Sequence, residues 1–156
     1  MIQRIQSVFL LLLSLSMLSI LALPLWHKAD QLTHQELTLG AFGFTAANMP
    51  APGGPVWVIA MLTFASSVVA TYEIFQFRNR LTQLKLGTLN LLLIVATFGT
   101  AYYFAGRGEV NLNIKLEGHF QPAFYLPTIA LILNLLANRF IRRDEQHVRS
   151  SYDRLR

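Results

Sequence analysis

Four long apolar segments constrain the fold of this chain more than any other feature. They cover about residues 5–25, 56–77, 86–104 and 125–141. A hydrocarbon core of roughly 30 Å requires about 20 mostly apolar residues of α-helix. Because backbone groups in lipid must bond within their own span, an open chain crosses a membrane only as helices. The sequence therefore predicts an all-α membrane protein, a four-helix transmembrane bundle in a single domain.

The composition supports the membrane class over a soluble one. Only 13% of the residues are charged, against about a quarter in ordinary soluble domains, while 53% are hydrophobic. The basic residues flank the apolar segments and form no single patch with interleaved aromatics, so we expect anionic lipid headgroups, and no nucleic acid, as the partner of the net positive charge. The chain has no cysteine, which excludes disulfides and cysteine-ligated metals.

The first apolar segment has two interpretations. Arg4 precedes it, as in a secretory signal peptide. However, the apolar run is long, and the residues after Ser19 offer no good small-x-small cleavage site. We therefore expect a retained span.

The distribution of lysine and arginine predicts the orientation. With the N-terminus inside, ten basic residues are cytosolic and three are outside. The cytosolic set is Arg4, Arg78, Arg80, Lys85, Arg139, Arg142, Arg143, Arg149, Arg154 and Arg156, and the outer set is Lys28, Arg107 and Lys115. The positive-inside rule then predicts that both termini lie in the cytosol.

Glu73 is an acid inside the end of the second span, next to the basic turn that contains Arg78 and Arg80. Arg139, at a similar depth on the fourth span, is its expected partner in an ion pair. The alternative is a proton relay or ion site, because acids within spans often mark such paths. No histidine, lysine or aspartate lies at the middle of a span, so we favour the ion pair.

Amides and small hydroxyl residues within the spans are expected to pack helices together. Asn134 and Asn138 are four residues apart and share one helix face, as do Thr63, Ser67 and Thr71 on the second span. Interhelical amide hydrogen bonds and small residues allow close helix approach. These residues are packing features more often than sites.

The two outer loops, about residues 27–55 and 107–122, each contain a strand-like piece. Residues 36–45 form one, and residues 109–117, with alternating apolar side chains, form the other. The pieces either pair into a small sheet or belong to unrelated loops. We favour a small extracytoplasmic β element, since an isolated strand would leave an apolar face wet.

The cytosolic tail, residues 142–156, is expected to continue the fourth helix. It begins with Arg142 and Arg143 and ends with the segment that contains Asp153 and Arg154. It either docks on a protein partner or anionic lipid, or anchors the topology with a solvated helix end. The second interpretation is favoured.

The sequence offers no catalytic, cofactor-binding or metal site. The spacing of His27, His34 and His119, with Glu36 and Glu117, matches no established ligand motif. No phosphate-loop, zinc-protease or nucleophile-elbow motif occurs.

Three stretches together resemble a Bacteroidota family of domains of unknown function (domain of unknown function 4293). They are residues 1–12, the inner turn at residues 72–87 and the tail at residues 141–156. The resemblance extends over the whole chain. It implies a short four-span protein of a bacterial inner membrane, and it implies no catalytic residues.

We therefore expect a non-enzymatic accessory or scaffold subunit that contacts another membrane protein or its own copies through its helices and cytosolic tail. The alternative is a small-ligand or lipid-handling protein, or a transporter component, with a hydrated cavity between the spans. The lack of a central charge favours a dry, close-packed interior.

Overall fold

The computed structural model describes residues 2–76, 79–112 and 115–153, with side chains from residue 5 to residue 143 of these ranges. Within them the chain forms four long helices: α1 (Ile2–Ala22), α2 (Val58–Phe75), α3 (Arg80–Asn111) and α4 (Leu126–Asp153). A 3-10 turn, η1 (Pro122–Tyr125), precedes α4. Each long helix contains a stretch that is long and apolar enough to cross a membrane. The prediction of four such helices is confirmed.

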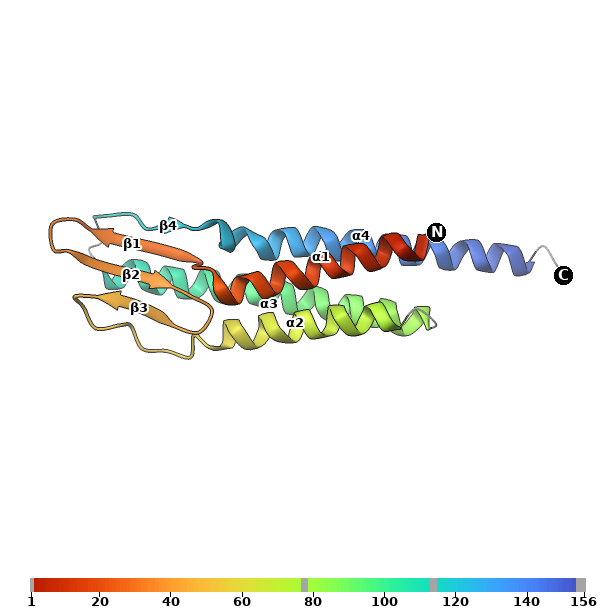
Figure 1. Ribbon diagram of the computed structural model, residues 1–156, viewed down its shortest axis with the longest axis horizontal. Helices are drawn as coiled ribbons and strands as arrows, with labels where there is room; N and C mark the ends of the chain where they lie inside the picture. Colours follow the sequence, from red (N-terminus) through yellow and green to blue (C-terminus); the bar gives the residue numbers. More distant parts are fainter. Residues whose placement is uncertain (1, 77–78, 113–114, 154–156) are drawn as a thin grey trace.

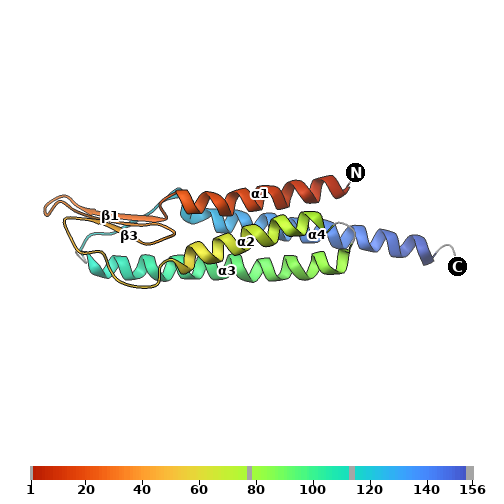
Figure 2. The same cartoon turned by 60° about the horizontal axis from the view of Figure 1, so that its bottom comes forward.

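The four helices form a ring in which α1 packs on α2 and α4, and α3 packs on the same two helices. Helices α1 and α3 lie on one diagonal, and α2 and α4 lie on the other (Figures 1 and 2). Leu13, Met17 and Ile20 of α1 meet Ile59 and Ile94 in the apolar core. The start of α1, the end of α2 and the start of α3 lie at one end of the bundle, which we call the terminal end, and α4 extends beyond it (Figure 1).

The helix bounds differ from the predicted spans most at α3. This helix begins at Arg80, where the Asn79 side chain caps it by accepting a hydrogen bond from the Thr82 N–H at 3.3 Å. It continues to Asn111, for 32 residues, or roughly 48 Å at 1.5 Å per residue. Helix α3 is therefore longer than a hydrocarbon core. Helix α4 continues past the apolar segment to Asp153, as the tail prediction required.

A four-stranded antiparallel sheet covers the opposite end of the bundle, which we call the sheet end (Figure 1). Its strands are β1 (Trp26–Asp30), β2 (Gln35–Leu39), β3 (Phe44–Ala47) and β4 (His119–Phe120), in the order β3-β2-β1-β4. Trp26 pairs with Leu39 on one side and with Phe120 on the other. The α1–α2 and α3–α4 connections thus both contribute to one sheet, as predicted for these two loops.

The predicted strands are only partly correct in the first loop. The strand-like piece at residues 36–45 is divided by a turn, closed by a 2.9 Å hydrogen bond from the Gly40 N–H to the Gly43 carbonyl. The first strand, β1, was not predicted. Its buried side chains are Trp26, Lys28 and Asp30. Because two of these three are charged, the apolar alternation that predicts a strand is absent.

The predicted strand at residues 109–117 is wrong. Helix α3 continues to Asn111, and the strand of this loop is instead the short β4 at His119–Phe120. The physical reason lies at the last turn of α3, where the Lys28 ammonium donates hydrogen bonds to the carbonyls of Glu109, at 2.9 Å, and Leu112, at 3.5 Å. Carbonyls at a helix end lack intrahelical partners, and this cation satisfies two of them. Residues 113–114 lie outside the described residues.

Candidate functional site

Polar side chains inside the bundle bond neighbouring helices to one another. The hydroxyls of Ser14 on α1 and Ser67 on α2 lie 2.7 Å apart. The Ser66 hydroxyl of α2 donates to Asn90 Oδ1 of α3 at 2.6 Å. The Asn134 amide of α4 donates to the Gly87 carbonyl of α3 at 2.9 Å. Three of the four helix interfaces therefore carry a buried interhelical hydrogen bond.

Asn134 and Asn138, which the sequence placed on one face of their helix, both contact Gly87 of α3. The Asn138 amide donates to Asn134 Oδ1 at 3.4 Å. Its own oxygen packs against Gly87, where a Cβ would overlap the Asn138 amide group. Gly87 thus allows α3 and α4 to approach closely at this level.

The predicted ion pair between Glu73 and Arg139 does not form. The Glu73 side chain is fully buried, and neither carboxylate oxygen has a hydrogen-bond partner in the described part of the chain. Arg139 is exposed. The physical reason is topological, since α2 and α4 lie on a diagonal of the ring and do not share an interface. Glu73 contacts α3 instead, where its backbone carbonyl accepts a 3.3 Å hydrogen bond from the Gln83 amide.

A basic groove lies between α3 and α4 near the terminal end. It has a volume of about 650 Å³. Its lining residues, which define the groove below, are Thr88, Leu91, Leu135, Asn138, Arg139, Arg142 and Arg143. Four of the predicted interaction residues therefore share one surface, and three of these are arginines. Among the residues whose side chains the structure describes, no acid lines the groove.

The remaining predicted residues contribute less to this geometry. Arg80 is the first residue of α3. Arg78 and Arg154 lie outside the described residues. Asp153 ends α4, and its side chain also lies outside the described part. The interaction roles of these residues remain predictions.

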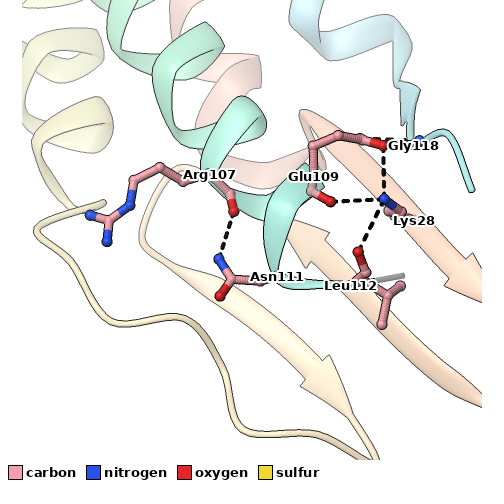
Figure 3. Close-up of polar contacts among 6 residues, drawn as sticks. All are labelled: Lys28, Arg107, Glu109, Asn111, Leu112 and Gly118. Atoms are coloured by element: carbon pink, nitrogen blue, oxygen red, sulfur yellow. Dashed lines mark hydrogen bonds and ion pairs between the residues drawn. The ribbon is translucent and has the colours of Figure 1, made fainter. Parts of the chain in front are cut away.

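An ion pair joins the sheet to the end of α3, and no sequence pattern pointed to it. Figure 3 shows Lys28 of β1 reaching the last turn of α3, where its Nζ lies 2.8 Å from Glu109 Oε1. The Lys28 side chain is 0% exposed and that of Glu109 is 38% exposed. The Gly118 N–H donates to the same carboxylate at 3.1 Å. Glu109 therefore connects β1, α3 and the segment before β4.

The Trp26 side chain packs against Gly108 and Gly118, next to the residues that Glu109 connects. A Cβ at Gly118 or at Gly108 would overlap its indole ring. Beside it lies a smaller cavity, about 360 Å³ in volume, whose lining includes Tyr102, Gly106 and Phe120. The glycines of this region are conspicuous in the sequence only as turn or helix interruptions, so sequence reasoning missed their packing role.

The outer histidines do not assemble into a metal centre. His27 Nδ1 lies 2.9 Å from the Thr38 hydroxyl, within the β1–β2 pair. Among the residues that the structure describes, no three His, Asp or Glu side chains gather in a group that would hold a metal ion.

A comparison with protein families gives one match over nearly the whole chain. The family is described as a domain of unknown function (DUF4293), and it matches residues 2–155. A comparison with curated proteins gave no match.

Proposed function

Because this chain belongs to the DUF4293 family, whose description assigns no reaction, we propose its role from its surface and its interior. It is a non-enzymatic accessory or scaffold subunit embedded in a membrane. It acts through contacts made by its helices and by the terminal part of α4, and not through chemistry at an active site.

The exposed apolar faces of the helices, together with polar side chains buried among the apolar core, are the observation that carries membrane embedding. Ser66, Asn90, Thr97 and Asn134 are fully buried. The exposed faces of the helices are apolar instead. They include Val8, Leu11, Leu15, Met61, Phe64, Val68, Leu92, Val95, Ile132 and Leu135, each at least 46% exposed. A soluble bundle would place these side chains inside, whereas lipid solvates them well.

The charge distribution supports a bacterial inner membrane with both termini in the cytosol. Arg139, Arg142 and Arg143 lie near the terminal end, and the sheet with Lys28 lies at the other. The bilayer orientation that follows places the terminal end inside and the sheet outside. Alkaline phosphatase fused after Arg156 should be inactive in cells, whereas green fluorescent protein at that position should fluoresce. An active phosphatase would reverse the orientation.

The interior favours a scaffold over a transporter. Several of its buried polar groups form bonds between helices, such as Ser14–Ser67 and Asn134–Gly87. The groove and the smaller cavity described above lie toward the two ends of the bundle and not at its middle. A bundle bonded in this way provides a rigid framework for a partner.

Crosslinking mass spectrometry in native-lipid discs tests the scaffold role. The expected result is crosslinks from the terminal part of α4 or from the turn at residues 76–79 to one membrane protein or to a second copy of the chain. Finding lipid alone, with crosslinks only within one chain, would overturn the proposal. Resistance of the protein to alkaline carbonate extraction tests membrane embedding separately.

A further inference from the structure

We propose that the basic groove binds one anionic phospholipid of the surrounding bilayer, with its phosphate on the arginines and an acyl chain on the leucines. This inference rests on the proposed membrane embedding. Beyond membrane embedding, the inference specifies the class of lipid and the place on the molecule where it binds.

The charge of the groove selects an anionic headgroup. Arg139, Arg142 and Arg143 line it together with Thr88, and none of the lining residues that the structure describes is acidic. Guanidinium groups bind phosphate oxygens in a planar, two-pronged geometry. The ammonium of a zwitterionic ethanolamine headgroup would meet three positive charges here. A glycerol headgroup carries no such cation, so phosphatidylglycerol is the better fit.

The polarity of the groove changes along the helix axis as it does along a lipid. On α4, Leu135, Arg139 and Arg143 follow at intervals of four residues and therefore share one face. Leu135 lies toward the middle of the bundle, and the arginines lie toward its terminal end. Leu91 of α3 lines the apolar part. A free phosphate would use only the arginine part, whereas a phospholipid matches both parts.

The floor of the groove is fixed by the contact between α3 and α4. Asn138 lines the groove and packs against Gly87, and Asn134 is bonded to the Gly87 carbonyl. These contacts fix the position of α3 relative to α4 next to the arginines of the groove. A pre-formed groove binds without the cost of ordering its walls.

Native mass spectrometry of the full chain in detergent micelles tests the proposal with phosphatidylglycerol, phosphatidylethanolamine and soluble glycerol 3-phosphate as probes. We expect one tightly bound phosphatidylglycerol, at a dissociation constant at least tenfold below that of phosphatidylethanolamine. Each arginine substitution, R139Q, R142Q or R143Q, should weaken the phosphatidylglycerol complex about fivefold, given the usual contribution of one basic residue near an anionic surface. Substitution L91E should weaken it as well.

The matched control is K85Q, which removes one exposed positive charge at the same end of the bundle from a residue outside the groove lining. It should change binding by less than about twofold, since an exposed charge that does not line the groove makes no direct contact with the phosphate and exposed ion pairs contribute little. Equal weakening by K85Q and R142Q would overturn a defined site in favour of general attraction to the surface. Equal affinity for glycerol 3-phosphate would overturn the lipid assignment.

The same preparations separate this proposal from the one on which it rests. If the protein resists carbonate extraction but shows no preference for phosphatidylglycerol, the lipid site is wrong and membrane embedding stands. If the protein is extracted from membranes by carbonate, both proposals fail. Circular dichroism of each variant establishes that its helices are intact before binding is compared.

Discussion

Lys28 and Glu109 form an ion pair across 81 residues of sequence, with Nζ and Oε1 2.8 Å apart. The lysine is completely buried and also bonds two backbone carbonyls at the end of α3. The glutamate is partly exposed and receives the Gly118 N–H. The two residues are therefore unequal partners, because only the lysine depends on the pair for its solvation.

This inequality predicts the outcome of a mutant cycle at the pair. Substitution E109A leaves a buried ammonium without its counter-ion and should lower the free energy of unfolding by about 1–3 kcal/mol. Substitution K28M should lower the free energy of unfolding by a smaller amount. The double variant K28M/E109A should be more stable than E109A alone. Unfolding by SDS titration in micelles measures all three. A double variant less stable than E109A would contradict the buried-lysine argument.

The close contact of Gly108 with Trp26 predicts different effects for two neighbouring glycines of α3. A Cβ at Gly108 would overlap the indole ring, so G108A should be destabilising by about 1–3 kcal/mol through overpacking. Gly106 has open space where a Cβ would lie, so G106A should be neutral or stabilising by up to about 1 kcal/mol, the usual helix-propensity gain. Thermal unfolding followed by tryptophan fluorescence compares them. Equal effects at the two positions would show that helix propensity alone determines the change in stability, and that the contact with Trp26 does not contribute.

Glu73 has no hydrogen-bond partner among the residues that the structure describes, and this predicts that its removal stabilises the bundle. A fully buried acceptor without a hydrogen bond is unfavourable by about 1–3 kcal/mol, so E73L should raise the free energy of unfolding by an amount in that range. The control E117L, at an exposed acid, should change it by less than about 0.5 kcal/mol. A loss of stability in E73L, measured in discs, would reveal a partner for the carboxylate within the membrane or in an assembly.

The 2.6 Å bond between Ser66 and Asn90 predicts a modest coupling between α2 and α3. Interhelical hydrogen bonds of this kind average about 0.6 kcal/mol in membrane proteins. The single variants S66A and N90A and their double variant should give a coupling energy near that value. Additive effects, measured by SDS titration, would show that the bond contributes nothing beyond packing.

The helices were predictable because apolar length is a local property of the sequence. The ends of the helices were less predictable, since they depend on contacts with residues that are distant in the sequence. Pro24 signals the end of α1 in the sequence itself, whereas the end of α3 depends on a lysine 81 residues earlier. Strand β1 was missed because its buried face contains Lys28 and Asp30, and a pattern of apolar alternation does not detect buried charges.

The sequence predicted four residues of the basic groove as interaction candidates, but it did not predict the groove. Arg139, Arg142, Arg143 and Asn138 were candidates from charge and spacing, but Thr88 and Leu91 of α3 were not, because no local feature places them opposite those residues. The Glu73–Arg139 pair failed for a related reason. Similar depth in four spans does not determine which helices are neighbours, and the ring places α2 and α4 on opposite corners.

The order of the strands has a consequence for biosynthesis. Strand β1 is central in the sheet, between β2, which follows it at once, and β4, whose residues are made only after α3 is complete. A nascent chain emerges from its N-terminus first. Strand β1 therefore has one edge without a partner strand, and Lys28 has no counter-ion, until the second half of the protein has been translated. A chain that ended before Glu109 would thus have an unfinished sheet, with the β4 side of β1 unpaired and Lys28 without its counter-ion.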